Sequence, residues 1–309
     1  MFFCSPMAVS YSHRCCYFIN TAKYVLFYIV PVMKRRKFVQ NISASMLLLM
    51  SNGIVGPAKA ADIRKKSLLR FAVTSDGHYG EKNTPFETYS SAITNALNSF
   101  NSASPIDFCV FNGDIIHNDP AFLQPAAEAI KQCRMPVYVT KGNHDMVSRE
   151  AWSQTWQMDI NHDVVLGDNV LLLGTTADEK GKYLCPDQDW FAAKLEQYKA
   201  ARNIFIFLHI TPVKWTKHAV NCPSFQELLL STKNVRAVFN GHDHDQDGIK
   251  FLGNIPFLFD GHFGGSWGTA YHGFRIVELQ EDNSLLTYMM DPLKKLAELN
   301  IYRQDAVLE

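Results

Sequence analysis

The stretch "NVRAVFNGHDHD", residues 234–245, runs from an apolar segment directly into two histidines that are one residue apart. The apolar part predicts a buried strand that ends at Asn240-Gly241. His242 and His244 therefore follow the carboxyl end of a strand, where open α/β sheets collect their ligands. The question is whether other strands of the chain end in the same way.

Four other predicted strands also end in polar, metal-binding residue types. They are "LLRFAVTSD" before Gly77-His78, "IDFCVFNGD" ending in Gly113-Asp114, "MPVYVTKGNHD" ending in Gly142-Asn143-His144-Asp145, and "RNIFIFLHITP" with His209. Carboxylate, imidazole and amide oxygen together suit borderline divalent metals such as Zn, Mn and Fe. The groups outnumber the needs of one tetrahedral ion, so the pattern predicts a two-metal site that shares a carboxylate.

Glycine directly precedes three of these candidate ligands, at Gly113, Gly142 and Gly241. A residue without Cβ lets the backbone turn sharply or approach an ion closely. One such glycine is common at a strand end, whereas three in the same relation to candidate ligands favour a metal site.

From residue 69 onward, short apolar runs alternate with segments of helical periodicity. Helices are expected over about 86–100, 120–133, 187–200 and 223–232, followed by several consecutive strands and a final short helix near 292–299. This order predicts an α/β layered domain. No linker or repeat interrupts residues 61–309, so we expect one domain there.

The composition is that of a globular protein, with 47% hydrophobic and 19% charged residues among 309. Residues 1–60 contain seven Lys or Arg and no Asp or Glu, which leaves 23 basic against 30 acidic residues in the rest of the chain. An acidic body argues against nucleic-acid binding, because such binding rests on neutralising phosphates.

The N-terminal region, residues 1–60, is interpreted as an extension and export signal. From Met33 the chain reads "MKRRKFVQNISASMLLLMSNGIVGPAKA", a basic start, an apolar stretch and an A-x-A pattern ending at Ala60. We expect translation to start at Met33 and cleavage to follow Ala60. Arg35-Arg36 resembles a twin-arginine signal, and a general secretory signal is the alternative.

Export would place the mature chain in the periplasm. The run "YVLFYIVPV" upstream of Met33 is about half the length that a membrane span needs, so no stable span is expected in the mature chain. A membrane anchor built from both apolar stretches is the alternative.

Processing at Ala60 would leave four of the seven cysteines. No CxxC occurs among them, which argues against a zinc ribbon or a thioredoxin-type site. In an exported protein they could form disulfides in three pairings, although Cys109, within a predicted strand, fits a small buried hydrophobe. The four are Cys109, Cys133, Cys185 and Cys222.

Taken in order, the strand ends give the pattern D-x-H, G-D, G-N-H-D, H and G-H-x-H over residues 76–244. This pattern resembles that of the calcineurin-like metallophosphoesterases. The resemblance implies a sandwich of two mixed β-sheets flanked by helices, with a dimetal centre between the sheet edges. It also implies a metal-dependent phosphoric ester hydrolase that uses two divalent ions and a metal-bridging hydroxide.

The same resemblance implies a role for each strand-end residue. His144 would donate a proton to the leaving oxygen. One metal would be held by Asp76, His78, Asp114 and His244, and the other by Asp114, Asn143, His209 and His242.

One position departs from the family pattern. Many relatives carry Asp three residues after the G-D aspartate, where it orients the catalytic histidine, and purple acid phosphatases carry Tyr there. This sequence has His117, which together with D-x-H in the first block argues against the purple-acid subgroup. The candidates for orienting His144 are Asn118, Asp119 and Asp145.

The resemblance implies a small phosphoester as the substrate, with phosphodiesters such as cyclic nucleotides first, because the D-x-H form is common among relatives of that kind. A phosphomonoesterase is the alternative. A non-catalytic metal-binding scaffold on the same fold is a further alternative, but its signature, loss of His144 or of the bridging carboxylate, is missing. The G-N-H-D block argues against an amide hydrolase.

Aromatic residues outside the pattern receive simpler interpretations. His262, in "FDGHFGGSWG", is expected to be a solvated turn residue, and a position at the rim of the site is the alternative. His162, His218 and His272 lack motif context and are expected at the surface or in the core. The tryptophans are expected to pack in the core or against helices. The alternative for Trp215 and Trp267 is that they reach the mouth of the site and stack on an organic leaving group.

Overall fold

Two six-stranded sheets form the framework of the computed structural model, which describes residues 48–50, 53–55, 67–292 and 294–301. The first sheet has the strand order β14-β13-β12-β3-β4-β5, and the second has the order β10-β11-β9-β8-β7-β6. The strands of the first sheet are β3 Ser67–Thr74, β4 Phe108–Asn112, β5 Val137–Thr140, β12 Phe274–Gln280, β13 Leu285–Asp291 and β14 Lys294–Ile301. Those of the second sheet are β6 His162–Leu166, β7 Asn169–Gly174, β8 Asn203–Leu208, β9 Val235–Asn240, β10 Ile249–Leu252 and β11 Ile255–Phe259.

Both sheets are mixed. In the first, β3, β4 and β5 are parallel, whereas β12 joins β3 antiparallel and continues into the antiparallel strands β13 and β14. In the second, β7, β8, β9 and β11 are parallel, and β6 and β10 close the two edges antiparallel. A further short pair, β1 Leu48–Met50 and β2 Gly53–Val55, forms its own antiparallel ladder.

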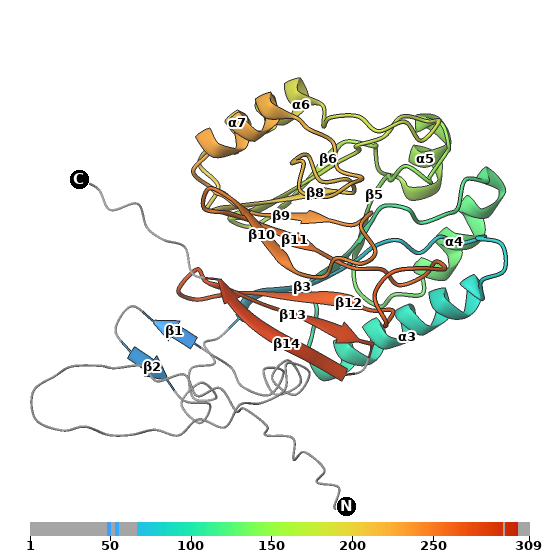
Figure 1. The fold of residues 1–309 in the computed structure, drawn as a ribbon, viewed down its shortest axis with the longest axis horizontal. Helices are drawn as coiled ribbons and strands as arrows, with labels where there is room; N and C mark the ends of the chain where they lie inside the picture. Colours follow the sequence, from blue (N-terminus) through green and yellow to red (C-terminus); the bar gives the residue numbers. More distant parts are fainter. Residues whose placement is uncertain (1–47, 51–52, 56–66, 293, 302–309) are drawn as a thin grey trace, which may run out of the picture. The chain divides into compact units, whose positions relative to one another are not determined.

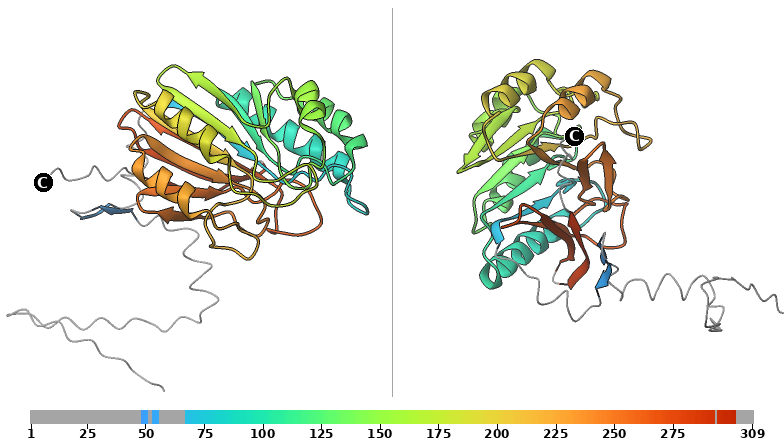
Figure 2. Two further views of the ribbon diagram at one scale, coloured as in Figure 1. Left: turned by 90° about the horizontal axis from the view of Figure 1, so that it is seen from above. Right: turned by 90° about the vertical axis from the view of Figure 1, so that its left-hand side faces the viewer.

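Helices cover the outer faces of the two sheets (Figures 1 and 2). Residues of α3, α4 and α5 share a buried cluster with the first sheet, and residues of α6 and α7 share another with the second. The helices are α3 Phe86–Ala103, the 3₁₀ turn η2 Pro120–Phe122, α4 Leu123–Ile130, α5 Arg149–Trp156, α6 Gln188–Gln197 and α7 Pro223–Ser231. The expected sandwich of two mixed sheets flanked by helices is confirmed.

The core between the sheets is aromatic. Phe71 of β3 stacks on Phe108 of β4 at 4.7 Å between ring centroids and meets Phe205 of β8 edge-on at 5.3 Å. Phe207 and Phe239 stack on each other from β8 and β9. All five rings are almost completely buried. Offset and edge-on ring pairs fix the spacing of the sheets, which brings the carboxyl ends of β3, β4, β8 and β9 together.

The last expected element was wrong. Residues 294–301 form strand β14, paired with β13, instead of a helix near 292–299. The segment "KKLAELNI" has good helix formers, but β13 would otherwise expose an unpaired edge of backbone N–H and C=O groups. Pairing along β13 outweighs the small intrinsic preference for helix. The sequence did not predict strand β6 or helix α5 either. Helix α5 begins after Ser148, whose side chain accepts a hydrogen bond from Ala151 N.

Most of the N-terminal extension lies outside the described residues. Of the interpreted signal over 33–60, only β1 and β2 are described, so the start at Met33 and the cleavage after Ala60 stay predictions. Within the described part of the chain, no helix combines the length and apolarity that a membrane crossing requires.

A buried ion pair joins the two sheets. Arg275 of β12 reaches across to Asp260, which follows β11, with 3.3 Å between Nε and Oδ1, and its Nη2 donates to Phe259 O at 2.6 Å. Both side chains are nearly inaccessible to solvent. Burial raises the pKa of Asp260 to about 7 although Arg275 opposes the shift. Removing either partner would leave the other charge buried without compensation.

Replacing Arg275 by Met should leave the Asp260 carboxyl buried without its cation. We expect the free energy of unfolding to fall by about 3–5 kcal/mol, the usual cost of breaking a buried pair. Urea denaturation of the purified protein measures it. Arg202→Met removes an exposed arginine and should change stability by less than about 0.5 kcal/mol. Equal effects of the two variants would contradict the role given to the pair.

Candidate metal centre

The polar strand ends of both sheets meet in one place. Asp76 follows β3, and its backbone N–H donates to Gly113 O after β4 at 3.0 Å. Gly241 N after β9 donates to His209 O after β8, also at 3.0 Å. The carboxyl ends of neighbouring parallel strands thus hold one another, and the candidate ligands converge as expected for an open α/β edge.

Two groups of three candidate ligands lie side by side, each with its ligand atoms within 4.8 Å of one another. All six side chains are buried. We call these groups triad A and triad B. Triad A is Asp76, His78 and His244, and triad B is Asp114, His209 and His242.

Asp114 lies between the triads. Its Oδ2 is 3.0 Å from Nε2 of His209 in triad B and 3.8 Å from Nε2 of His78 in triad A. Within triad A, Asp76 Oδ1 is 3.1 Å from His244 Nε2. Asp76 Oδ1 also lies 3.7 Å from His209 Nε2, so both carboxylates face both triads, and the position of Asp114 is compatible with the shared role that the family pattern gives it.

Unpaired buried atoms show that the donor set fits cations. Asn143 Oδ1 and His242 Nε2 are buried without a hydrogen-bond partner among the described residues, and Asp76 Oδ1 and His209 Nε2 have none beyond the histidine–carboxylate contacts of the two triads. Such atoms cost free energy unless something satisfies them. All four belong to the expected ligand set, and oxygen with imidazole nitrogen suits borderline divalent metals. The residues present therefore fit two divalent ions.

Backbone strain is concentrated at the same residues. Asp76, His78, Asp114 and His242 have φ of 59°, 44°, 50° and 67°. L-residues rarely adopt such left-handed conformations, which persist when the surroundings impose them and gather at functional sites. These four residues with left-handed backbone are all members of triad A or triad B.

The expected close approach at the glycines is present. A Cβ on Gly142 would come within 2.3 Å of Asp114 Oδ1, and a Cβ on Gly113 within 2.4 Å of His209 Nδ1. At Gly241 the nearest atom, Asp76 Oδ2, would be 2.7 Å away. Any larger residue would push a candidate ligand out of place.

Backbone carbonyls fix the orientation of two histidines. His209 Nδ1 donates to Asn112 O at 2.7 Å, and His244 Nδ1 donates to Trp267 O at 2.9 Å. This leaves Nε2 of each ring, the atom that faces the triads, as the free ligand atom. His78 differs, because its Nδ1 lies 3.0 Å from Nδ1 of His117.

The electrostatics are those of a buried anionic site. Burial alone would raise the pKa of Asp76 and Asp114, but the neighbouring histidines hold both pKa values well below the usual range. Burial would lower the pKa of His209, yet Asp114 and Asp76 raise it to about 10. Burial lowers the pKa of His78 to about 3 and that of His242 to about 4. The pKa of His244 is raised too, by Asp76, so the two ionised carboxylates draw positive charge to this place, which favours bound cations.

Asn118 orients His144. Its Oδ1 accepts from His144 Nδ1 at 2.8 Å, and the His144 ring stacks on His117 at 4.8 Å. Asp145 instead accepts from the backbone N–H groups of Ile116 and Gly142, and Asp119 caps η2. Of the three candidates from the sequence, the structure thus brings only Asn118 to the imidazole.

A cavity of about 230 Å³ opens above the triads. The sequence did not predict Glu81, Tyr183 or His218 at the site. They lie on loops, and no sequence motif shows that these loops meet at the cavity. The Tyr183 and His218 rings lie 5.0 and 5.9 Å from the His242 ring. The cavity is lined by His78, Glu81, Asp114, His117, His144, Tyr183, His218, His242, His244 and Trp267.

The expectation for His262 was wrong, whereas the default interpretation of Trp215 as a packing residue is confirmed. His262 is not a solvated turn residue, because it is 2% exposed, stacks on His244 at 5.1 Å and has both ring nitrogens near backbone carbonyls. Trp215 does not reach the cavity but packs edge-on against Phe257 in the core beneath α6 and α7. Trp267 does reach the cavity.

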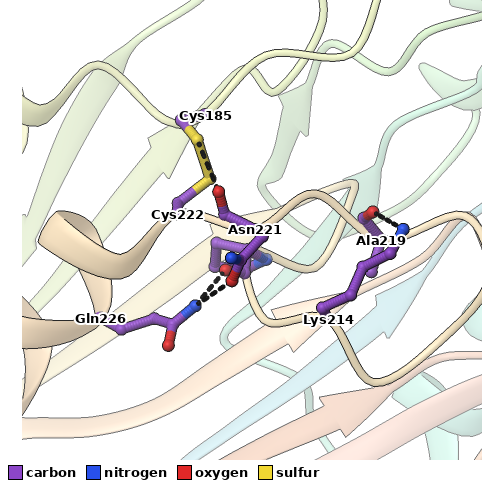
Figure 3. Close-up of a disulfide and its surroundings, with 7 residues drawn as sticks. Cys185, Lys214, Ala219, Asn221, Cys222 and Gln226 are labelled. Carbon is purple, nitrogen blue, oxygen red and sulfur yellow. Dashed lines mark hydrogen bonds between the residues drawn. A yellow bond between two sulfur atoms is a disulfide. The ribbon is translucent and has the colours of Figure 1, made fainter.

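A disulfide ties two loops at the rim of the cavity. Cys185 and Cys222, 37 residues apart in sequence, join the loop that carries Tyr183 to the loop that carries His218 (Figure 3). Gln226 Nε2 holds the second loop by donating to Asn221 Oδ1. Cys109 is buried with a free thiol, as the sequence predicted.

Comparisons with known proteins agree with this geometry. No curated protein sequence matches the chain significantly. The structure of a dimetal phosphatase from Danio rerio superposes with a TM-score of 0.62 at 15% identity, covering 77% of this chain and 100% of that one. A purple acid phosphatase from yellow lupin (Lupinus luteus) seeds gives 0.57 at 12% identity, covering 76% of this chain and 54% of that one.

Both structures share the fold, and the family match covers more than half of the sequence. The calcineurin-like phosphoesterase profile matches residues 69–246, the segment that carries all the strand-end residues of both triads. The chain therefore belongs to the calcineurin-like phosphoesterase family and is a metal-dependent hydrolase of phosphoric esters.

Proposed function

We propose that the protein hydrolyses small phosphodiesters, with cyclic nucleotides among the candidate substrates. The observation that carries the proposal is the charge of the cavity wall. Among the described residues that line it there is no Lys or Arg, and Glu81 adds a carboxylate. A phosphomonoester carries nearly two negative charges at neutral pH, whereas a diester carries one, so such a wall favours the diester.

The nearest buried lysine does not change this charge balance. Lys141 precedes Gly142-Asn143, but its Nζ donates to Asp178 O at 3.0 Å and it is absent from the cavity wall. Glu81 is held at the rim, where its Oε1 accepts from Ser266 Oγ at 2.7 Å. No Lys or Arg of the described cavity wall would therefore add to the positive charge of the metal ions.

The two triads, with Asn143, would hold the two ions in the arrangement expected from the sequence. When bound, divalent cations lower the pKa of water and offset the charge that develops on phosphoryl oxygens. Asp76, His78, Asp114 and His244 would form the first site. Asp114, Asn143, His209 and His242 would form the second.

His144 would serve as the proton donor to the leaving oxygen. Because an amide oxygen only accepts, the bond to Asn118 Oδ1 requires the proton on His144 Nδ1. A second proton on Nε2 is then the one available to the substrate, and the ring lines the cavity where the substrate would lie. An amide behind the imidazole fixes its orientation without adding a negative charge.

We also propose export of the protein to the periplasm. The basic segment with Arg35-Arg36 and the Ala58-Lys59-Ala60 pattern support it. The Cys185–Cys222 disulfide supports it independently, since disulfides persist in oxidising compartments.

Hydrolysis of bis(p-nitrophenyl) phosphate and p-nitrophenyl phosphate, with Mn²⁺ or Zn²⁺ added, tests the proposal. We expect metal-dependent turnover with a higher kcat/KM on the diester. Asp114→Asn should lower kcat by at least about 100-fold, since it removes a ligand shared by both sites. Asp245→Asn, a matched change at an exposed neighbour of His244, should leave kcat nearly unchanged.

Preference for the monoester would make the protein a phosphomonoesterase. Metal-loaded, folded protein that turns over neither substrate would instead support a non-catalytic metal-binding protein.

Replacing Asn118 by Ala tests the orientation of His144. We expect kcat to fall about 10- to 100-fold when the leaving group is poor, which is part of the roughly 100- to 10,000-fold that a positioned general acid supplies, because the imidazole stays but loses its orientation. A p-nitrophenolate leaving group needs little protonation, so its release should change much less. Asn118→Asp keeps an acceptor and should retain most activity. An equal loss with both leaving groups would contradict an acid role for His144.

A further inference from the structure

A second cavity, of about 390 Å³, lies next to the one above the metal centre. Trp267 lines both cavities, so the two share one wall. The second cavity combines aromatic rings, including Tyr89 and His272, with neutral polar side chains such as Asn83 and Thr84. Among the described residues that line it, none is Lys, Arg, Asp or Glu. Its chemistry suits a planar, uncharged group with polar edges.

Trp267 is held flat against a candidate metal ligand. Its ring stacks on His244 with 4.1 Å between centroids and 4° between planes, and its carbonyl accepts from His244 Nδ1. The side chain is nevertheless 51% exposed. A large aromatic ring that is fixed by one contact and otherwise open is a ready stacking surface.

The loop that carries Trp267 is fixed to the metal centre. Gly264 N donates to Asp76 O, and Thr269 N donates to His244 O, each at 3.0 Å. Gly268 has φ of +134°, and a Cβ there would come within 2.6 Å of His244 and His262. These contacts position the ring before any ligand arrives, which reduces the entropy cost of binding.

The order of the rings indicates which part of a substrate would reach this cavity. From His144 the row runs to His78 at 4.8 Å, on to His244 at 4.9 Å, and then to Trp267 at 4.1 Å. His144, the proposed proton donor, must lie at the leaving oxygen. Trp267 stands at the other end of the row, so it would contact the ester group that stays on phosphorus.

We propose that the second cavity binds the retained ester group of the phosphodiester, and that this group is an aromatic or heterocyclic ring stacked on Trp267. The proposal rests on the diesterase function proposed above. Occupation of the cavity would favour diesters with a ring on the retained side over those with a small alkyl group.

Two diesters with the same leaving group test the proposal. In methyl p-nitrophenyl phosphate and phenyl p-nitrophenyl phosphate, water adds to phosphorus, the P–O bond to p-nitrophenolate breaks, and the methyl or phenyl monoester remains. We expect kcat/KM to be about tenfold higher for the phenyl ester, within the range for a base on an aromatic side chain. Trp267→Ala should abolish this preference, so that the phenyl-to-methyl ratio of kcat/KM falls from about ten to about one.

Two further variants complete the test. Trp267→Phe should keep most of the preference, and Trp215→Ala, a tryptophan outside both cavities, should leave the phenyl-to-methyl ratio unchanged. No preference in the wild type, or an equal loss on both esters in Trp267→Ala, would overturn the proposal. The second result would show that Trp267 acts only by supporting His244.

Calorimetry separates failure of this proposal from failure of the diesterase function. If neither diester is hydrolysed, the proposed function fails, but the cavity can still be tested by binding of phenyl phosphate and methyl phosphate to the metal-loaded protein. Binding of phenyl phosphate that is about tenfold tighter and depends on Trp267 would uphold the cavity's role, and equal binding would overturn it.

Discussion

The structure depends on the burial of two carboxylates, Asp76 and Asp114, beside four imidazoles at the edge of two sheets. Both carboxylates are at most 1% exposed, and the histidines around them hold their pKa values low, so they stay charged where water cannot reach them. A buried charge without compensation is costly, and divalent ions are the compensation that this donor set fits. The left-handed backbone at four of the candidate ligands and the glycines packed against them position the donor atoms for that role.

Packing in the rest of the fold offsets the destabilising effect of this site. Strained residues and buried charges lower the stability of the apo chain, so the surrounding structure must fix them in place. The aromatic layer between the sheets does this on one side, where rings from β3, β4, β8 and β9 interlock directly beneath the strand ends. On the other side, Arg275 and Asp260 join the sheets, and the Trp267 loop packs on the backbone of Asp76 and His244. Precise ligand placement is thus a property of the whole sandwich.

The sequence predicted local features and those that depend on where the strands end. An apolar run that stops at Gly or Asn before a histidine or aspartate can be recognised without a structure, and parallel strands bring such ends together. Features that depend on which loops meet in space could not be predicted. His78 and Trp267 lie far apart in sequence, Asn118 and Asp145 were equal candidates beside His144, and nothing in the spacing of four cysteines selects Cys185 with Cys222. The prediction for the segment of β14 was wrong because the sequence shows the helix propensity of these residues, but not that the neighbouring strand β13 has an edge available for pairing.

Electron paramagnetic resonance of the Mn²⁺-loaded protein, together with metal analysis of the same sample, tests the central claim most directly. Two sites that share Asp114 would place the ions about 3.5–4 Å apart. We predict two Mn²⁺ per chain and the spectrum of an exchange-coupled pair, converted to that of a single ion by Asp114→Asn. One ion per chain, or two ions with the spectrum of isolated Mn²⁺, would contradict a dimetal centre built on a shared carboxylate.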